Sequence, residues 1–187
     1  RGAQQLYKKW AETHILESHL EPMQVFVTDE RCVPLEHCDS NHHMIKQTLF
    51  SGHVPPGTVL HPMAGNVDDF SAEAKRYGKL LPEAIDLMLL SMGEDGHIAS
   101  LFPHSSALTE ARKKIIPIQG PKAPYQRLTI TPMVIKNAKQ VFVLALGDEK
   151  RRMYQQALED PQDIEAIPAR LVVDRTWIFD LEDEVAL

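Results

Sequence analysis

Two short runs of almost unbroken apolar residues constrain what this chain can fold into. Residues 85–90 contain one charged side chain, and residues 141–146 contain none. Strands buried on both faces have this composition, whereas a strand with one solvated face alternates polar and apolar residues. Because helices cover both faces of a parallel sheet, the two runs predict a mostly parallel sheet flanked by helices.

Helical and strand patterns alternate along the rest of the chain, as such a sheet requires. We predict helices over residues 3–20, 42–50, 67–81, 132–138 and 149–158, with a loop over 52–65. Further strands are predicted over residues 23–28, 115–118, 127–131, 171–173 and 177–179. No repeat or linker divides the sequence, so we expect residues 1–187 to form a single α/β domain with a Rossmann-like sheet.

The composition excludes several classes of protein. The 187 residues are 43% hydrophobic and 25% charged, as in an ordinary globular chain, and no apolar run is long enough to predict a membrane span. A net charge of -6 argues against binding nucleic acid through a basic surface. Cys32 and Cys38 fit neither a disulfide framework nor a common zinc spacing, so we expect free thiols in a reducing cytoplasm.

A charged or titratable side chain follows each of three predicted strands. Arg31 follows the strand over 23–28, His97 follows the run over 85–90, and Lys150 follows the run over 141–146. Ligands of such sheets bind beyond the carboxyl ends of the strands. We therefore expect one edge of the sheet to collect two cations and a base, which suits a small anionic substrate and proton transfer.

His97 is the strongest candidate for a catalytic residue. Gly93 and Gly96 precede it in a turn, where both can adopt a positive φ and let backbone amides approach a ligand. An imidazole titrates near pH 6.5, at about the right value for a general base, and Asp95 is close enough in sequence to orient it. The alternative is an ordinary turn histidine on a solvated loop.

The cationic residues also have structural alternatives. Arg31 can form an ion pair with Asp29 or Glu30 that fixes the turn. Lys150 lies in the first turn of a predicted helix, where a cation opposes the helix dipole, so a nearby anion or simple solvation accounts for it. Arg127 opens a strand and has the least local support.

The sequence gives no support for a metal site. His42 and His43 are adjacent, so they point to different sides of a helix, and no zinc-type spacing completes a set of ligands. Dinucleotide-binding, Walker and G-x-S-x-G motifs are also absent from the sequence. We predict that the protein binds no metal.

Four motifs, in order along the chain, resemble those of 6-phosphogluconolactonases. Residues 29–34 read DERCVP and residues 37–41 read HCDSN, similar to the family pattern DER-x-VP followed by H-x-DSN. Residues 92–103 read MGEDGHIASLFP and resemble G-x-DGH-x-ASLFP. The blocks RLTIT at 127–131 and G-x-x-K at 147–150 complete the resemblance, which covers residues 2–180.

The resemblance implies a sugar-phosphate isomerase/CoA-transferase-like fold and hydrolysis of 6-phospho-D-glucono-1,5-lactone to 6-phosphogluconate in the oxidative pentose phosphate pathway. It implies no metal or organic cofactor. His97 would act as general base on water, and Asp95 would orient it. The implied substrate-binding residues are four charged residues and one glycine: Arg31, Lys150, Arg127, Asp29 and Gly96. Backbone amides around Gly96 are candidates for stabilising the oxyanion.

Members of this family begin with a strand–helix–strand unit and a glycine-rich loop that cradles phosphate, whereas this sequence starts just after that loop. We therefore expect the N-terminal strands to be missing, either because the given chain omits them or because it is a short form. Their loss would expose a sheet edge and weaken phosphate binding.

Two other functions remain open at this point. Glucosamine-6-phosphate deaminases share the fold, and in such an isomerase Asp29 would shuttle a proton, but they usually read DEY in the first motif and FNEP after the histidine. The other alternative is a non-catalytic relative that only binds a sugar phosphate. The expected partner is a small sugar phosphate, without nucleic acid or membrane, for a cytoplasmic protein that we expect to be a monomer.

Overall fold

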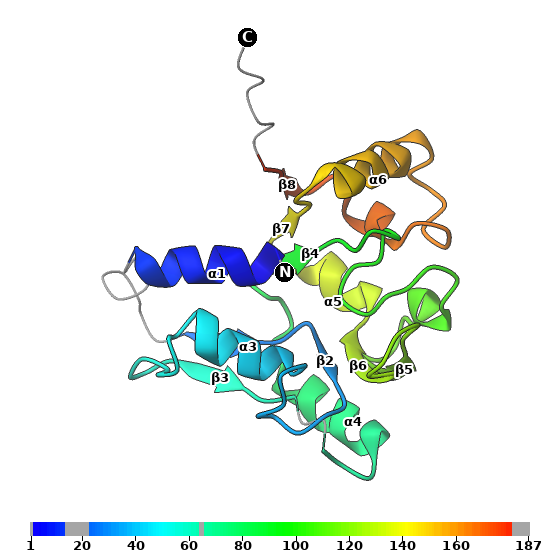
Figure 1. The fold of residues 1–187 in the computed structure, drawn as a ribbon. Helices are drawn as coiled ribbons and strands as arrows, with labels where there is room; N and C mark the ends of the chain where they lie inside the picture. Colours follow the sequence, from blue (N-terminus) through cyan, green and yellow to red (C-terminus); the bar gives the residue numbers. More distant parts are fainter. Residues whose placement is uncertain (1, 14–22, 64–65, 181–187) are drawn as a thin grey trace.

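Helices and strands alternate along the chain, and the strands form three small sheets (Figure 1). The computed structural model describes residues 2–13, 23–63 and 66–180. The helices are α1 (Gly2–Glu12), α3 (Asn41–Thr48), α4 (Phe70–Leu80), α5 (Pro132–Asn137) and α6 (Asp148–Glu159), with 3-10 helices η1 (Ser106–Thr109) and η2 (Pro168–Val172). The strands are β1 (Gln24–Phe26), β2 (Asp29–Arg31), β3 (Val59–His61), β4 (Leu87–Ser91), β5 (Ile115–Gln119), β6 (Gln126–Ile130), β7 (Gln140–Leu144) and β8 (Thr176–Ile178).

Two of the sheets are parallel, as the apolar runs predict. One has the strand order β4-β7-β8, and β1 pairs with β3 in the other. In β4, Met88 and Leu90 are buried, whereas Leu89 on the other face is half-buried and Leu87 is 54% exposed. The expectation that both faces of this strand are buried is therefore only partly met, although α1 contacts β4.

The third sheet is antiparallel and has the order β2-β6-β5. The sequence predicts two of its strands, but it places Asp29–Arg31 in a loop rather than in β2. β5 includes Pro117, which an edge strand tolerates because one side of its backbone needs no partner. The mixed arrangement matters for the site, because this sheet brings Arg31 and Arg127 together in direct register.

Three other predictions need correction. β3 lies within the stretch predicted as a loop, because its three residues are too few to outweigh the flanking prolines in the sequence pattern. The strand predicted over 171–173 is part of η2, in which Pro168 fixes the first φ and favours a helical turn. The helix predicted over 3–20 ends at Glu12, and residues 14–20 lie outside the described part of the chain.

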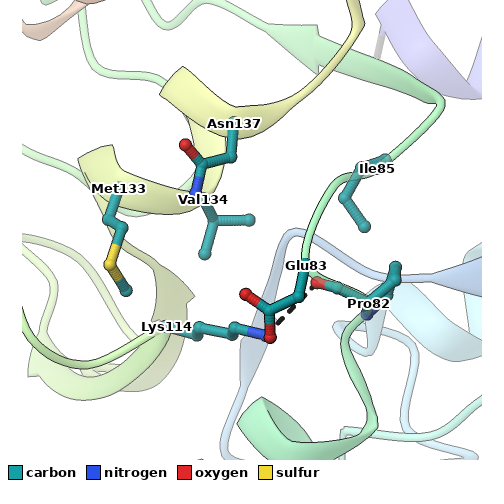
Figure 2. Close-up of a pocket in the computed structure, with 7 residues that line it drawn as sticks. All are labelled: Pro82, Glu83, Ile85, Lys114, Met133, Val134 and Asn137. Atoms are coloured by element: carbon teal, nitrogen blue, oxygen red, sulfur yellow. Dashed lines mark hydrogen bonds and ion pairs between the residues drawn. The ribbon is translucent and has the colours of Figure 1, made fainter.

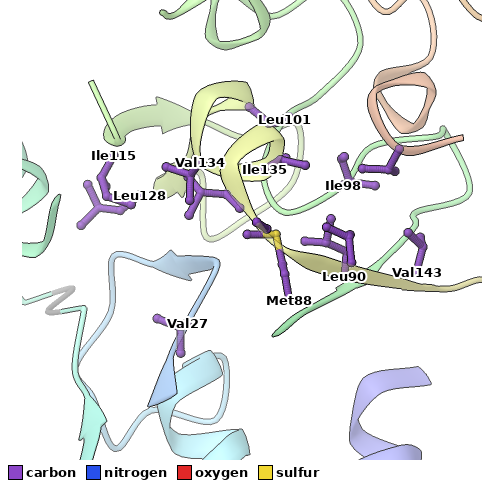
Figure 3. Packing of buried hydrophobic residues seen from close by; sticks show 14 of the residues in the cluster. Val27, Met88, Leu90, Ile98, Leu101, Ile115, Leu128, Val134, Ile135 and Val143 are labelled. Atoms are coloured by element: carbon purple, nitrogen blue, oxygen red, sulfur yellow. The ribbon is translucent and has the colours of Figure 1, made fainter. Parts of the chain in front are cut away.

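One cluster of buried apolar side chains joins the sheets (Figure 3). Val134 and Ile135 of α5 contribute to it together with Leu90 of β4 and Leu128 of β6. Tyr77 of α4 is fully buried, and its hydroxyl accepts a hydrogen bond from the Val27 amide at 2.8 Å. Within the described ranges, none of the helices is long and apolar enough to span a membrane.

A buried carboxylate connects β2 to the start of α3. Glu30 is 1% exposed, and its two oxygens accept four hydrogen bonds, from the backbone amides of Arg31, Asn41 and His42 and from Ser40 Oγ. Burial raises the pKa of Glu30, and these four donors oppose the increase because they favour the ionised form. The carboxylate thus fixes the backbone on both sides of Arg31.

We expect Glu30→Gln to destabilise the fold by roughly 1–3 kcal/mol, because a glutamine offers one acceptor oxygen and leaves buried donors facing its NH2 group. Urea denaturation measures this loss. Glu159→Gln makes the same chemical change at an exposed position and should stay within about 0.5 kcal/mol of wild type. Equal unfolding midpoints for the two variants would contradict the assigned role of Glu30.

Candidate active site

His97 lies in a tight turn that continues directly from the parallel sheet. The Met92 amide donates to the Leu144 carbonyl at 3.0 Å, which extends the ladder between β4 and β7. The Gly93 amide then donates to the His97 carbonyl at 2.8 Å, and the Gly96 amide donates to the Gly93 carbonyl at 3.1 Å. The Gly96 amide is therefore hydrogen-bonded inside the turn.

The two glycines of this turn have different roles. Gly96 adopts a φ of 78°, as predicted, and a Cβ there would lie 2.6 Å from Ile167 Cγ2. Gly93 is not among the residues with positive φ, so that part of the prediction is wrong. It is required for space instead, because a Cβ on Gly93 would collide with the His97 ring.

Asp95 is hydrogen-bonded to His97. Its Oδ1 is hydrogen-bonded to His97 Nδ1 and also accepts the His97 amide at 3.3 Å. The hydrogen bond from the imidazole is the main cause that lowers the pKa of Asp95. An ionised carboxylate can only accept, so Nδ1 is the donor in this hydrogen bond, and in a neutral imidazole Nε2 then keeps its lone pair. The His97 side chain is 30% exposed, which leaves it accessible to a substrate.

Arg31 and Arg127 lie directly opposite each other on β2 and β6. Burial lowers the pKa of Arg127, and the positive charge of Arg31 adds to that effect, whereas Asp29 and Asp39 oppose it. Like charges in directly opposed positions destabilise a pair of strands. The register therefore places two positively charged residues opposite each other.

The hydrogen bonds of both guanidinium groups go to neutral acceptors. Arg31 Nη1 donates to the Asp39 carbonyl at 2.8 Å and to Asn41 Oδ1 at 2.9 Å, and its buried Nε has no partner. Arg127 donates to the carbonyls of Pro124 and Lys122, each at 3.3 Å. In the described part of the chain, Arg31 thus makes no ion pair with Asp29 or Glu30, the alternative left open by the sequence. Asp29 and Asp39 offset part of the positive charge on Arg127, and an anionic ligand would offset more of it.

The ring of Phe102 lies beside both His97 and Arg127. Its centroid is 4.8 Å from that of the His97 imidazole and 5.5 Å from the guanidinium carbon of Arg127. The candidate base and one of the two arginines therefore occupy the same neighbourhood, although they come from different sheets.

Lys150 lies in the first turn of α6, near Glu94 of the His97 turn. Gly147 precedes this helix with a φ of 95°, and its amide donates to both carboxylate oxygens of Asp180 at 3.1 and 3.0 Å. Burial lowers the pKa of Lys150, and the negative charge of Glu94 in the His97 turn opposes that effect. Lys150 is therefore close enough to this turn to interact electrostatically with it.

Asp29 connects the parts of the site rather than facing open solvent. Its Oδ2 accepts a hydrogen bond from the buried Ser100 hydroxyl at 2.6 Å, and its Oδ1 accepts one from Asn41 Nδ2 at 3.3 Å. Ser100, Asn41 and Phe102 all lie within the quoted motifs, yet their side chains carry no charge that would mark them as functional in the sequence.

A small pocket is lined by none of the candidate site residues (Figure 2). Pro82, Glu83 and Ile85 line it just before β4 begins, whereas the His97 turn follows the end of that strand. Lys114 Nζ contacts Glu83 Oε1 at 3.1 Å beside it. Its volume of about 40 Å3 has room for little more than water, so it cannot hold a sugar phosphate.

Possible metal ligands gather at one place in the described part of the chain. His37, Cys38 and Asp39 have ligand atoms within 4.8 Å of one another on an exposed turn. His37 Nδ1 already accepts the Asp39 amide at 3.1 Å. Such consecutive exposed side chains do not form the enclosed, fully coordinated arrangement of a structural metal centre.

Relatives with established names resemble this chain over most of its length. A 6-phosphogluconolactonase from Rattus norvegicus is 34% identical over 165 residues, covering 81% of this chain and 63% of the rat protein. One from Synechocystis is 33% identical over 173 residues, covering 86% of this chain and 71% of that protein. The chain thus spans less than two thirds of the length of the rat relative.

Solved structures share the fold. A 6-phosphogluconolactonase from Trypanosoma brucei matches with a TM-score of 0.76 at 28% identity, covering 98% of this chain and 81% of that chain. A monomeric glucosamine-6-phosphate deaminase matches with a TM-score of 0.77 at 22% identity, covering 95% and 80%, which shows the fold alone. The predicted α/β fold is confirmed. A sequence model of glucosamine-6-phosphate isomerases/6-phosphogluconolactonase matches residues 1–179, and the chain belongs to this family.

Proposed function

We propose that the protein hydrolyses 6-phospho-D-glucono-1,5-lactone to 6-phosphogluconate, the second step of the oxidative pentose phosphate pathway. The observation that supports this most is the oriented Asp95–His97 pair beside Arg127, which directly faces Arg31. A base beside two cations, whose charge Asp29 and Asp39 offset only in part, suits a neutral ester that carries a phosphate. The names of the rat and Synechocystis relatives agree with this choice.

His97 would act first as a base and then as an acid. Its Nε2 takes a proton from water while the water oxygen bonds to the lactone carbonyl carbon, and the carbonyl oxygen becomes an oxyanion. When the oxyanion collapses, the bond to the ring oxygen breaks and Nε2 returns the proton to that oxygen. Asp95 stabilises the imidazolium that exists between the two transfers. The products are a free hydroxyl group and a carboxylic acid, which releases its own proton to solvent and becomes the carboxylate.

Arg31 and Arg127 would bind the phosphate, with Lys150 as a third cation. A dianion between the two guanidinium groups removes their mutual repulsion, so binding is favoured by the register of β2 and β6. Asp29 would contribute indirectly, because its carboxylate holds Ser100 and Asn41 around these cations. Gly96 would contribute through the turn conformation that presents His97.

No metal or organic cofactor takes part in this proposal, since the Asp95–His97 pair supplies both proton transfers. The single partner is the sugar phosphate, and we place the reaction in the cytoplasm with a monomer as the working unit. Release of ammonia from glucosamine 6-phosphate, without lactone hydrolysis, would favour the deaminase instead.

We expect His97→Ala to lower kcat by about 10²–10⁴-fold, the usual contribution of a positioned general base. The assay follows loss of the lactone, generated in situ, above its spontaneous rate. His53→Ala removes an exposed histidine of a different loop and should retain wild-type activity. Wild-type kcat in a folded His97→Ala protein would exclude the proposed base.

Arg31→Gln and Arg127→Gln should each raise KM by about tenfold or more, because each removes a charged donor to the phosphate. We expect kcat to change much less, since the phosphate is bound equally in the ground and transition states. Arg112→Gln removes an exposed arginine and serves as the matched control. An unchanged KM in both site variants would show that the phosphate binds elsewhere.

As pH rises, binding of 6-phosphogluconate should begin to weaken at a lower pH than it would if Lys150 had the pKa of an exposed lysine. A lysine is charged below its pKa, and burial lowers the pKa of Lys150 from 10.5, so its positive charge is lost earlier as pH rises. Lys150→Arg keeps its charge throughout this range and should remove most of that dependence. Calorimetric titration at several alkaline pH values measures both proteins, and identical pH profiles would contradict the role of Lys150.

A further inference from the structure

We propose that Phe102 is a positioning residue that holds the His97 imidazole and the Arg127 guanidinium in a fixed relation to each other. This inference rests on the proposed lactonase function and adds a residue to it. The ring of Phe102 contacts the His97 ring at 4.8 Å between centroids, and the guanidinium carbon of Arg127 lies over the same ring at 5.5 Å. One side chain thus touches both the candidate base and a candidate phosphate ligand.

Both contacts are attractive and directional. The two rings are tilted by 47°, within the range of favourable aromatic pairs, and the cation lies over the negatively polarised face of the ring. Phe102 is only 8% exposed, so these interactions are largely shielded from water. An aliphatic side chain of similar size would fill the space but would offer neither interaction.

The backbone around Phe102 is well anchored, as a positioning residue requires. The Leu101 amide donates to the Ile98 carbonyl at 2.9 Å, and the Ser105 amide donates to the Phe102 carbonyl at 3.1 Å. The Ser100 amide donates to Thr129 Oγ1 of β6 at 3.1 Å, which ties this segment to the strand that carries Arg127. The ring is therefore fixed relative to both of its partners.

Arg127 depends on the ring because few other groups restrain its end. Its two hydrogen bonds to carbonyl oxygens are each 3.3 Å long, near the upper limit for such bonds. The side chain also passes close to Gly120, where a Cβ would lie 2.6 Å from Arg127 Nε. Removal of the Phe102 ring would leave the guanidinium group with long hydrogen bonds and an open side.

The test compares Phe102→Leu with Phe102→Tyr, which keeps the ring. Phe50→Leu is the matched control, because Phe50 is also buried, at 5% exposed, but makes no ring contact with His97 or Arg127 in the described part of the chain. The measurements are kcat and KM for the lactone, together with thermal unfolding of each protein.

We expect Phe102→Leu to lower kcat and raise KM together, with kcat/KM falling about five- to thirtyfold, since it loosens the base and the phosphate ligand at once. Phe102→Tyr should restore most of both constants. Phe50→Leu should lose stability without a change in either. If Phe102→Leu instead keeps both constants and only unfolds earlier, the ring has a packing role and the inference is wrong.

A second measurement does not depend on activity. Long-range 1H–15N spectra report which ring nitrogen of His97 carries the proton, and we expect Phe102→Leu, but not Phe102→Tyr, to move the two nitrogen shifts toward averaged values. Unchanged shifts in Phe102→Leu would overturn the inference. If the wild type does not hydrolyse the lactone above the spontaneous rate, the proposed function fails, and the spectra alone then decide the role of Phe102.

Discussion

The repulsion between Arg31 and Arg127 is the constraint around which the site is organised. Their positions in direct register on β2 and β6 bring two guanidinium groups together, and their hydrogen-bond acceptors are neutral. Such an arrangement costs stability unless other contacts hold the strands in place. The buried Glu30 network supplies part of that restraint, because it fixes the backbone amide of Arg31 and the start of α3. The stability of the fold thus holds two like charges in register, and a bound anion would relieve a repulsion that Asp29 and Asp39 offset only in part.

His97, the candidate base, is held in a different way, by the turn that follows a parallel strand. β4 ends at Ser91, and the turn that follows has no space for a side chain at Gly93 because the His97 ring lies there. Asp95 then fixes the tautomer of that ring. The parallel sheet therefore places the proton-transfer group, and the antiparallel sheet places two of the cations. Asp29 and Ser100 join the two parts through a hydrogen bond of 2.6 Å.

The sequence predicts those parts of the fold and site that depend on local pattern. Largely apolar runs identify β4 and β7, and the residues that follow them identify His97 and Lys150. The sequence pattern does not predict short strands such as β2 and β3, because three residues are too few to show a periodicity. The opposition of Arg31 and Arg127 escapes it as well, since register across 96 positions depends on tertiary pairing rather than on local sequence. The prediction of a positive φ at Gly93 is wrong for a related reason: its constraint comes from the ring of His97, not from its own φ.

The motifs include uncharged residues beside the charged and catalytic ones, and these uncharged residues hold the charged ones in place. Asn41 contacts Arg31, Ser100 contacts Asp29, and Phe102 contacts Arg127, so each of the three touches a charged residue from another segment. A charged side chain on a flexible loop would sample many positions, and the entropic cost of ordering it would weaken ligand binding. These neutral contacts reduce that loss before the ligand arrives. The position of each charge is therefore encoded in a different stretch of sequence from the charge itself, and a motif that kept only its charged residues would not preserve the site.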